Sequence, residues 1–336
     1  MRDKIQIIAT LGPSTLNSNF LKISKKYLNL YRLNMSHLTL GKLEEDIKFL
    51  KKYKISNICI DTEGAQIRTG KVKNRYYKEN DKIILGFEKK KSNKYISIYP
   101  KFEIETLKKN TKIFIGFNEL KCEVLKHLPK EKILCKVLEG GLVENNKGVH
   151  IEQEIKLNPL TKKDIQAINL GVKYKIKKFA LSFANDAKDV QFIRSLAGKN
   201  SFIISKIETR KGFLNRNKII RESNAALIDR GDLSRYIPVS KIPYAQKDII
   251  KSGKKLKTPI YVATNLLESM VNSKSPTRAE SNDIITTLES GASGLVLAAE
   301  TAIGKYPFDS IQFLNECIKN FKKIRNKKIQ KNFLFS

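Results

Sequence analysis

The feature that most constrains this chain is the repeated alternation of short apolar, β-branched runs with helix-like segments. Eight runs have the length and composition of buried strands, and most precede a stretch with apolar residues at helical spacing. The expected strands are 4–10, 30–36, 56–61, 178–183, 202–208, 225–229, 259–264 and 294–300. A closing helix is expected at 307–324. Such alternation favours a parallel α/β sheet with helices packed on it.

This alternation is interrupted once, between about residues 71 and 147, by hairpin-like segments with turn signals and little helical period. We therefore predict an inserted β-rich, β-barrel-like domain at 71–147. The remaining chain, 1–70 and 148–325, is close to the about 250 residues typical of a (β/α)8 TIM barrel. We expect this fold, followed by a basic tail at 326–336. An open, doubly wound sheet is the alternative.

Charge is the unusual part of the composition, because 65 Lys and Arg face 33 Asp and Glu and give a net charge of +32. Such a balance is compatible with nucleic acid, an anionic membrane or anionic small substrates. The excess is spread along the chain without interleaved aromatic residues or a nucleic-acid motif. We interpret most of it as compositional drift on a solvated surface, and we do not expect nucleic acid as a partner.

Other compositional features indicate a cytoplasmic protein. No signal peptide precedes the first expected strand, and no apolar stretch approaches the about 18 residues of a membrane span. The cysteines are widely spaced and form no CxxC pair, which indicates reduced thiols rather than a zinc or redox site. They are Cys59, Cys122, Cys135 and Cys317.

Polar residues gather where the expected strands end. In a (β/α)8 barrel the carboxyl ends of the strands carry the catalytic groups, so this placement predicts an active site. In chain order the strand-end residues are Arg32, Asn34, Ser36, His37, Asp61, Thr62, Arg68, Lys206, Glu208, Arg230, Gly231, Asp232, Thr264 and Glu300.

Two carboxylates and a lysine form the most informative group. Glu208 and Asp232 end consecutive strands, and paired hard carboxylates at one barrel mouth suit Mg2+. Lys206 precedes Glu208 by two residues, so both side chains lie on the same side of the strand. Beside a metal ligand, its ammonium would neutralise charge on a transferring phosphoryl group. A simple Lys–Glu ion pair is the alternative.

Further strand-end residues suit anions. Gly231 lacks side-chain bulk, so backbone N–H groups beside it can approach an anion. Arg32 and Arg68 can donate charge-assisted hydrogen bonds to phosphate, although a lone arginine more often lies on a solvated surface.

Oxygen-bearing residues at the ends of the second and third expected strands suit a monovalent cation. Asn34, Ser36, Asp61 and Thr62 would supply the ligands, and strand-end capping is the alternative. Thr264 would either cap a following helix or orient a water that delivers a proton.

Several segments are nearly collinear with one enzyme family's sequence pattern. YRLNMSH matches R-x-N-F-S-H, IDTEGAQIRTG matches L-D-T-K-G-P-E-I-R-T-G, and DRGDLSRYIP matches A-R-G-D-L-G-x-E-I-P. VATNLLESMVNSKSPTRAE matches A-T-Q-M-L-E-S-M-x-x-x-x-x-P-T-R-A-E, and LAAETAIGKYP matches L-S-G-E-T-A-x-G-x-Y-P. Together these segments resemble the pyruvate kinase family over about residues 1–320, most weakly across the inserted domain.

The resemblance implies a (β/α)8 barrel with a β-rich lid inserted after the third strand. It also implies transfer of the phosphoryl group of phosphoenolpyruvate to ADP, giving ATP and pyruvate. Carried over by position, Lys206 would stabilise the phosphoryl group and Thr264 would help to protonate the enolate. The resemblance also implies possible homo-oligomers through barrel surfaces.

The same resemblance implies the ligand contacts. They are Glu208 and Asp232 for Mg2+, Arg32 and Arg68 for phosphate, the backbone of Arg230 and Gly231 for the substrate carboxylate, His37 for the nucleotide, Lys147 from the closing lid, and Asn34, Ser36, Asp61 and Thr62 for K+. A second Mg2+ would arrive with ADP.

The chain departs from the family pattern at several positions. Gln66 stands where K+-dependent members usually have Glu, which leaves the dependence on K+ open. The other departures are Leu38, Glu63, Ala65, Asn185, Tyr236, Ala298 and Ala299. The family's C-terminal domain is not found before Ser336, from which we expect loss of activation by effectors of the fructose bisphosphate type.

Two other functions stay open. One is another Mg2+-dependent barrel enzyme that forms a pyruvate enolate, such as an aldolase. The other is a non-catalytic relative that binds nucleic acid or a partner through its basic surface, with salt-sensitive binding and no turnover.

Overall fold

The computed structural model describes residues 5–87, 94–116 and 120–324. The chain divides into two compact units. One comprises the described residues up to Gly64 together with those from Pro159 onward, and the other is Ala65–Asn158. The basic tail expected at 326–336 lies outside the described residues.

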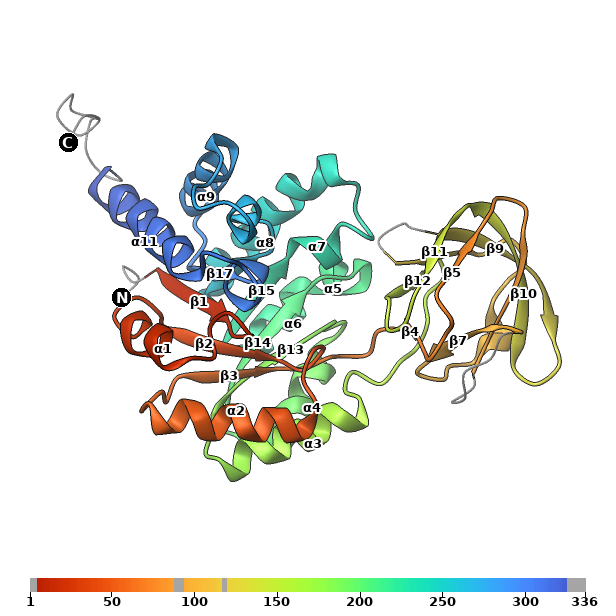
Figure 1. The fold of residues 1–336 in the computed structure, drawn as a ribbon, viewed down its shortest axis with the longest axis horizontal. Coiled ribbons are helices and arrows are strands. Elements are labelled where there is room, and N and C mark those ends of the chain that lie inside the picture. The colour runs from red at the N-terminus through yellow and green to blue at the C-terminus, as the bar shows by residue number, and fades with distance from the viewer. Residues whose placement is uncertain (1–4, 88–93, 117–119, 325–336) are drawn as a thin grey trace. The chain divides into compact units, whose positions relative to one another are not determined.

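The first unit is a closed barrel of eight parallel strands (Figure 1). Its strands are β1 (Gln6–Thr10), β2 (Leu30–Asn34), β3 (Ile58–Asp61), β13 (Lys178–Leu181), β14 (Phe202–Ile207), β15 (Ala225–Asp229), β16 (Ile260–Ala263) and β17 (Gly294–Leu297). Strand β1 pairs with both β2 and β17, which closes the barrel. The predicted (β/α)8 fold is confirmed, and the open-sheet alternative is wrong.

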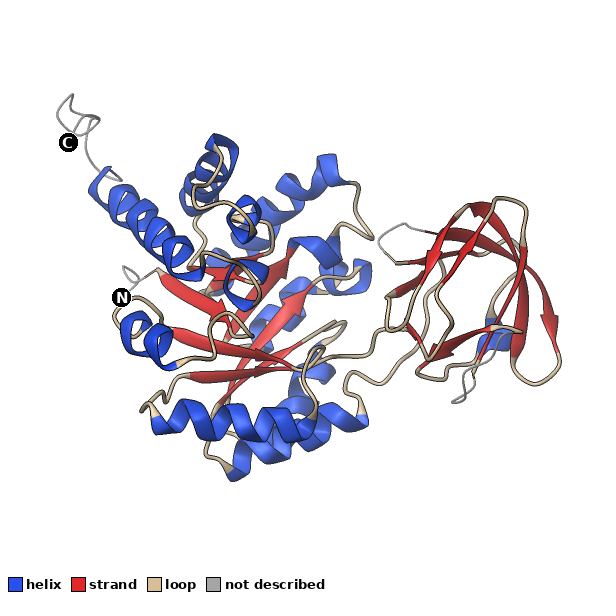
Figure 2. Ribbon diagram, in the orientation of Figure 1, coloured by secondary structure: helices blue, strands red, loops and turns tan. Residues whose placement is uncertain are grey.

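Helices follow the strands and surround the barrel (Figure 2). They are α1 (Ser18–Ser24), α2 (Leu40–Lys52), α3 (Lys162–Lys173), α4 (Ala187–Ala197), α5 (Arg210–Leu214), α6 (Arg216–Glu222), α7 (Arg230–Leu233), α8 (Ile242–Leu256), α9 (Arg278–Ser290), α10 (Ala299–Ala302) and α11 (Pro307–Ile324). Local sequence determines several starts: Thr161 and Asp164 form a capping box at α3, as Thr277 and Glu280 do at α9.

Two apolar layers hold this unit together, because side chains alternate between the two faces of each strand. On β1, Ile7 and Ala9 belong to the layer between strands and helices, which also contains Ile47 of α2. Ile8 belongs to a smaller cluster made of strand residues, which fills the barrel interior and also contains Tyr261. The barrel is therefore packed on both faces of its strands.

The second unit is rich in β-structure. A seven-stranded sheet has the order β12-β8-β9-β10-β6-β7-β4, and β11 pairs with β5. The strands are β4 (Arg68–Thr69), β5 (Arg75–Tyr77), β6 (Lys82–Gly86), β7 (Ile96–Tyr99), β8 (Lys112–Ile115), β9 (Leu120–Leu128), β10 (Lys132–Glu139), β11 (Gly141–Val143) and β12 (Val149–Ile151). This unit has its own core, including Ile113, Val124 and Ile133. The predicted β-rich insertion is confirmed.

At the carboxyl ends of the last strands, the structure corrects one prediction, the end of the last strand at Glu300, and excludes one of the two alternatives for Thr264. Strand β17 ends at Leu297, and Glu300 lies in α10, where its buried carboxylate accepts hydrogen bonds from the backbone N–H groups of Leu267 and Ala298. Thr264 is not a helix N-cap, because a 3-10 helix, η3 (Glu268–Val271), begins only after Leu267. Thr264 has a left-handed φ of 75°.

Two compositional expectations can be compared with the structure. All four cysteines are free and buried, as predicted. Among the described residues, none of the helices combines the length and the apolar character needed to cross a membrane.

Candidate active site

The carboxyl ends of β3, β14 and β15 bring one lysine among three carboxylates. The ammonium of Lys206 lies 3.1 Å from Glu208 Oε2, 3.4 Å from Asp229 Oδ2 and 3.8 Å from Asp61 Oδ2. It also donates a hydrogen bond of 3.2 Å to Ser182 Oγ. Lys206 is only 5% exposed and Glu208 is fully buried. Ionisable groups are buried this deeply only when they are paired, and Lys206 is paired with these carboxylates.

This crowding changes the acid–base properties of the group. Burial disfavours the charged form of Lys206, but Asp61, Glu208 and Asp229 outweigh it and raise the lysine's pKa above its usual range. Burial and repulsion from Asp232 and Asp229 outweigh the attraction of Lys206 and raise the pKa of Glu208 to about 8. Burial also opposes ionisation of Asp229, yet Lys206 and Thr264 lower its pKa. The raised pKa of Glu208 therefore follows from its burial and from the carboxyl groups crowded beside it.

The same carboxylates fit a divalent cation. Oxygen atoms of Glu208, Asp229 and Asp232 lie within 4.8 Å of one another. Glu208 Oε1 accepts a hydrogen bond of 2.6 Å from the backbone N–H of Phe183. Among the described residues, no group donates a hydrogen bond to the buried Glu208 Oε2, whose near contact is the Lys206 ammonium. Carboxylate oxygens are hard ligands, which is the kind of ligand that Mg2+ prefers in proteins.

Arg32 lies at the edge of this group and is held by its neighbours. Its Nε and Nη2 atoms lie 2.7 and 2.5 Å from Asp61 Oδ2, and Nη1 donates to Thr10 Oγ1 at 2.9 Å. Burial opposes the charge of Arg32, but Asp61 and Asp229 raise its pKa. The guanidinium is thus fixed at the barrel end before any substrate arrives.

The residues predicted to bind K+ lie together at the ends of β2 and β3. Asn34 is directly opposite Asp61 in the register of the two strands. The oxygens of this group also make local hydrogen bonds. Asn34 Oδ1 accepts from the backbone N–H of Ser36, and Thr62 Oγ1 accepts from the backbone N–H of Ser182. The arrangement is compatible with both cation binding and strand-end capping, so the K+ site stays a prediction.

Thr264 is held from two sides. Its hydroxyl donates a hydrogen bond of 2.7 Å to Asp229 Oδ1. Arg230 donates from Nε and Nη2 to the carbonyl oxygen of Thr264 at 2.9 and 2.6 Å, and its Nη1 pairs with Asp283 at 2.7 Å. A Cβ atom added at Gly231 would lie only 3.0 Å from Thr264 Cγ2. The turn at Arg230 and Gly231 therefore packs closely against Thr264.

The remaining predicted residues are placed as follows. Asp232 pairs with Arg235 at 3.3 Å, and His37 is exposed after β2. In the β-rich unit, Arg68 Nη1 donates to the carbonyl oxygen of Asn146 at 3.1 Å, and Lys147 pairs with Glu144 at 2.9 Å.

Sequence reasoning missed two residues of this group. Asp229 is the last residue of the expected strand 225–229, so the gathering of polar residues at strand ends is the signal that points to it. It also stands at the Ala of the A-R-G-D-L pattern. Ser182 directly follows β13 and accepts from Lys206, and its hydroxyl donates to the carbonyl oxygen of Thr62 at 2.7 Å. A serine after a strand is too common for sequence alone to single it out.

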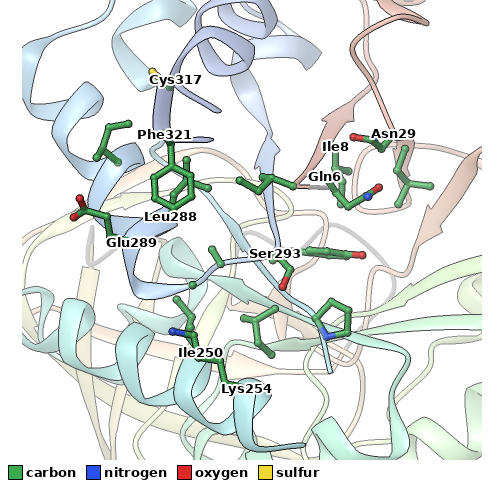
Figure 3. Close-up of a pocket in the computed structure, with 18 of the residues that line it drawn as sticks. Gln6, Ile8, Asn29, Ile250, Lys254, Leu288, Glu289, Ser293, Cys317 and Phe321 are labelled. Atoms are coloured by element: carbon green, nitrogen blue, oxygen red, sulfur yellow. The ribbon is translucent and has the colours of Figure 1, made fainter. Parts of the chain in front are cut away.

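A hollow of 1790 Å³ lies at the opposite, amino-terminal end of the barrel strands (Figure 3). Its lining includes Gln6 and Ile8 of β1, Leu288 and Glu289 of α9, and Phe321 of α11. Within the described part of the chain, its lining includes none of the predicted site residues. The charged group and this hollow are thus at different ends of one barrel.

Fold and site together define a (β/α)8-barrel protein with a buried lysine–carboxylate centre. A family model described as "Pyruvate kinase, barrel domain" matches residues 2–311. A pyruvate kinase of Methanocaldococcus jannaschii is 33% identical over 95% of this chain and 70% of its own length. One of Thermotoga maritima is 34% identical over 95% of this chain and 71% of its own length. The chain belongs to the pyruvate kinase family.

Proposed function

We propose that this chain is an active pyruvate kinase, which transfers the phosphoryl group of phosphoenolpyruvate to ADP in glycolysis. The observation that carries the proposal is the Lys206 ammonium, buried between Glu208 and Asp229 at the carboxyl end of the barrel. By the sequence resemblance, Lys206 and Glu208 would correspond to the family's catalytic lysine and metal-binding glutamate. The relatives' shared name supports the same activity.

In this reaction the bond between phosphorus and the enol oxygen breaks, and a bond between phosphorus and a terminal oxygen of ADP forms. The remaining enolate of pyruvate takes one proton from water at its methylene carbon. Lys206 would stabilise the negative charge of the transferring group with its fixed ammonium. Thr264 would orient the water that gives the proton.

Glu208 and Asp232 would hold Mg2+, with Asp229 close by. When bound, Mg2+ supplies positive charge that neutralises phosphoryl oxygens. Backbone N–H groups at Arg230 and Gly231 would bind the substrate carboxylate.

The other predicted residues complete the proposed site. Arg32 and Arg68 would contact phosphate, His37 would contact the nucleotide, and Asn34, Ser36, Asp61 and Thr62 would bind K+. The unit that carries Arg68 and Lys147 would act as a lid that excludes water, so that ADP accepts the phosphoryl group.

The test is an assay of pyruvate formation by the purified chain with phosphoenolpyruvate, ADP and Mg2+, in K+ and in Na+ buffer. Pyruvate should form only when both ADP and Mg2+ are present. Enolisation of pyruvate that needs Mg2+ but no nucleotide or phosphate, without phosphoryl transfer, would favour an aldolase-like enzyme instead. Salt-sensitive nucleic-acid binding without turnover would favour the non-catalytic alternative.

A further inference from the structure

Asp229 and Ala298, which end or follow the strands on either side of β16, differ from the family pattern in opposite ways. Strand β16, which Thr264 follows, lies between β15 and β17 in the barrel. Strand β15 ends in Asp229, where the pattern A-R-G-D-L has alanine. Strand β17 is followed by Ala298, where the pattern L-S-G-E-T has serine. The polar side chain therefore stands on the other side of Thr264 in this chain.

Asp229 contacts both Thr264 and Lys206. Its Oδ1 atom accepts the Thr264 hydroxyl at 2.7 Å, and its Oδ2 atom lies 3.4 Å from the Lys206 ammonium. The Asp229 side chain is 13% exposed, so water competes little for these contacts. One carboxylate thus connects the residue proposed for proton delivery with the residue proposed for phosphoryl transfer.

The surroundings restrict Thr264 further. Its backbone has a left-handed φ of 75°, which a β-branched residue adopts only when neighbours enforce it. Arg230 holds its carbonyl oxygen through two hydrogen bonds, and Gly231 leaves no room beside its methyl group. A threonine hydroxyl has one proton to donate and two lone pairs. Because the proton is donated to Asp229, the hydroxyl oxygen can only accept from a molecule in the site.

We propose that Asp229 is a positioning residue for proton delivery, and that it fixes the Thr264 hydroxyl as an acceptor. This inference rests on the proposed function. A water that donates one hydrogen to Thr264 Oγ1 would be held with its other hydrogen free for the methylene carbon of the enolate. The carbon gains that proton to give pyruvate, and the hydroxide left behind regains a proton from solvent. Asp229 acts here through Thr264 and Lys206 without touching the reacting carbon.

The test compares Asp229→Ala and Asp229→Asn with the double variant Asp229→Ala/Ala298→Ser, which restores the family's pair of residues. The measurements are kcat, KM for phosphoenolpyruvate, and hydrogen–deuterium exchange at the pyruvate methyl group in heavy water with ATP and Mg2+. Asp248→Ala is the matched control, because Asp248 pairs with Arg216 on the helix layer, away from this group.

Asp229→Ala should lower kcat and methyl exchange together by about ten- to a hundredfold, because an oriented proton donor contributes at least that much. KM should change less than about twofold if substrate binding is untouched. Asp229→Asn should retain more activity, since its amide oxygen can still accept from Thr264. The double variant should regain part of the loss, whereas Ala298→Ser alone should give no comparable gain. Asp248→Ala should match the wild type.

Wild-type kcat and exchange in Asp229→Ala would overturn this inference and leave the proposed function standing. A loss of Mn2+ affinity in Asp229→Ala as large as its loss of kcat would also overturn the inference, because Asp229 would then be a metal ligand. This affinity is measured with the metal alone. A wild-type chain that forms no pyruvate would overturn the proposed function and this inference together.

Discussion

The two ends of the barrel differ in the side chains that they bury. At the carboxyl end, the ionisable side chains of Lys206, Glu208 and Asp61 are at most 5% exposed. At the amino end, the hollow is lined largely by apolar side chains such as Ile8 and Leu288. Burying a charge weakens folding unless it is paired, whereas burying apolar surface strengthens it. Under the proposed function, the carboxyl end would serve chemistry at a cost in stability, whereas the buried apolar side chains at the amino end stabilise the fold.

The largest effect should come from removing the buried ammonium. Lys206→Met should lower phosphoryl transfer by about a thousandfold or more, because a fixed charge on the transferring group is lost. Lys178→Met is the matched control, since Lys178 starts β13 and lines the hollow. Pyruvate formation by the two variants would be measured after circular dichroism confirms that both fold. Equal activities would remove the functional distinction between the two ends.

The second largest difference between the two ends should be in metal affinity. Glu208→Gln should weaken Mn2+ binding by about tenfold or more, because the proposed carboxylate ligand is replaced by a neutral amide. Glu289→Gln, at the rim of the hollow, should leave the affinity unchanged. Calorimetric titration with Mn2+ measures both variants, and an unchanged affinity in Glu208→Gln would place the cation elsewhere.

A core truncation at the amino end should produce the reverse pattern. Leu288 is 2% exposed, so Leu288→Ala should lower the free energy of unfolding by about 2–5 kcal/mol while kcat stays near that of the wild type. Leu214→Ala is the control, because Leu214 is 66% exposed. Urea unfolding and the pyruvate assay give the two numbers. A large loss of kcat without loss of stability would contradict the division of roles.

The smallest effect concerns a carboxylate that stabilises the carboxyl end. Glu280 accepts hydrogen bonds from the backbone and hydroxyl groups of Ser269 and Thr277, which lower its pKa although partial burial opposes this. Its contribution is therefore full above the unfolded pKa and is lost as pH falls through the lowered folded pKa. Glu280→Gln should cost about 1 kcal/mol at neutral pH.

The pH dependence provides the check on Glu280. Urea unfolding at a series of pH values should show the difference between wild type and Glu280→Gln shrinking as the solution becomes acidic. Glu289→Gln, an exposed change on the same helix, should show no such trend. A difference that grows toward acid would mean that the sign of the pKa shift is wrong.

The sequence sufficed for the barrel because each strand and helix carries its own local pattern, and the closing helix Pro307–Ile324 matches the prediction at both ends. It also predicted that Lys206 and Glu208 lie on the same side of one strand, because they are two residues apart, and their side chains are in contact. It did not give the surroundings of Thr264, because Asp229 and Arg230, which follow one another at the end of β15, meet Asp283 of α9 there. The position of Glu300 was mispredicted for the same reason, because its carboxylate accepts a hydrogen bond from Leu267, which belongs to another loop.

The most direct test of the central claim is to follow the phosphorus atom itself. Phosphorus-31 NMR of the wild-type chain with phosphoenolpyruvate, ADP and Mg2+ reports the donor, the product and free phosphate in one sample. We predict that the phosphoenolpyruvate signal falls while the γ-phosphate signal of ATP rises by the same amount. Release of inorganic phosphate in place of ATP, or spectra that do not change with time, would contradict the assignment of phosphoryl transfer to this barrel.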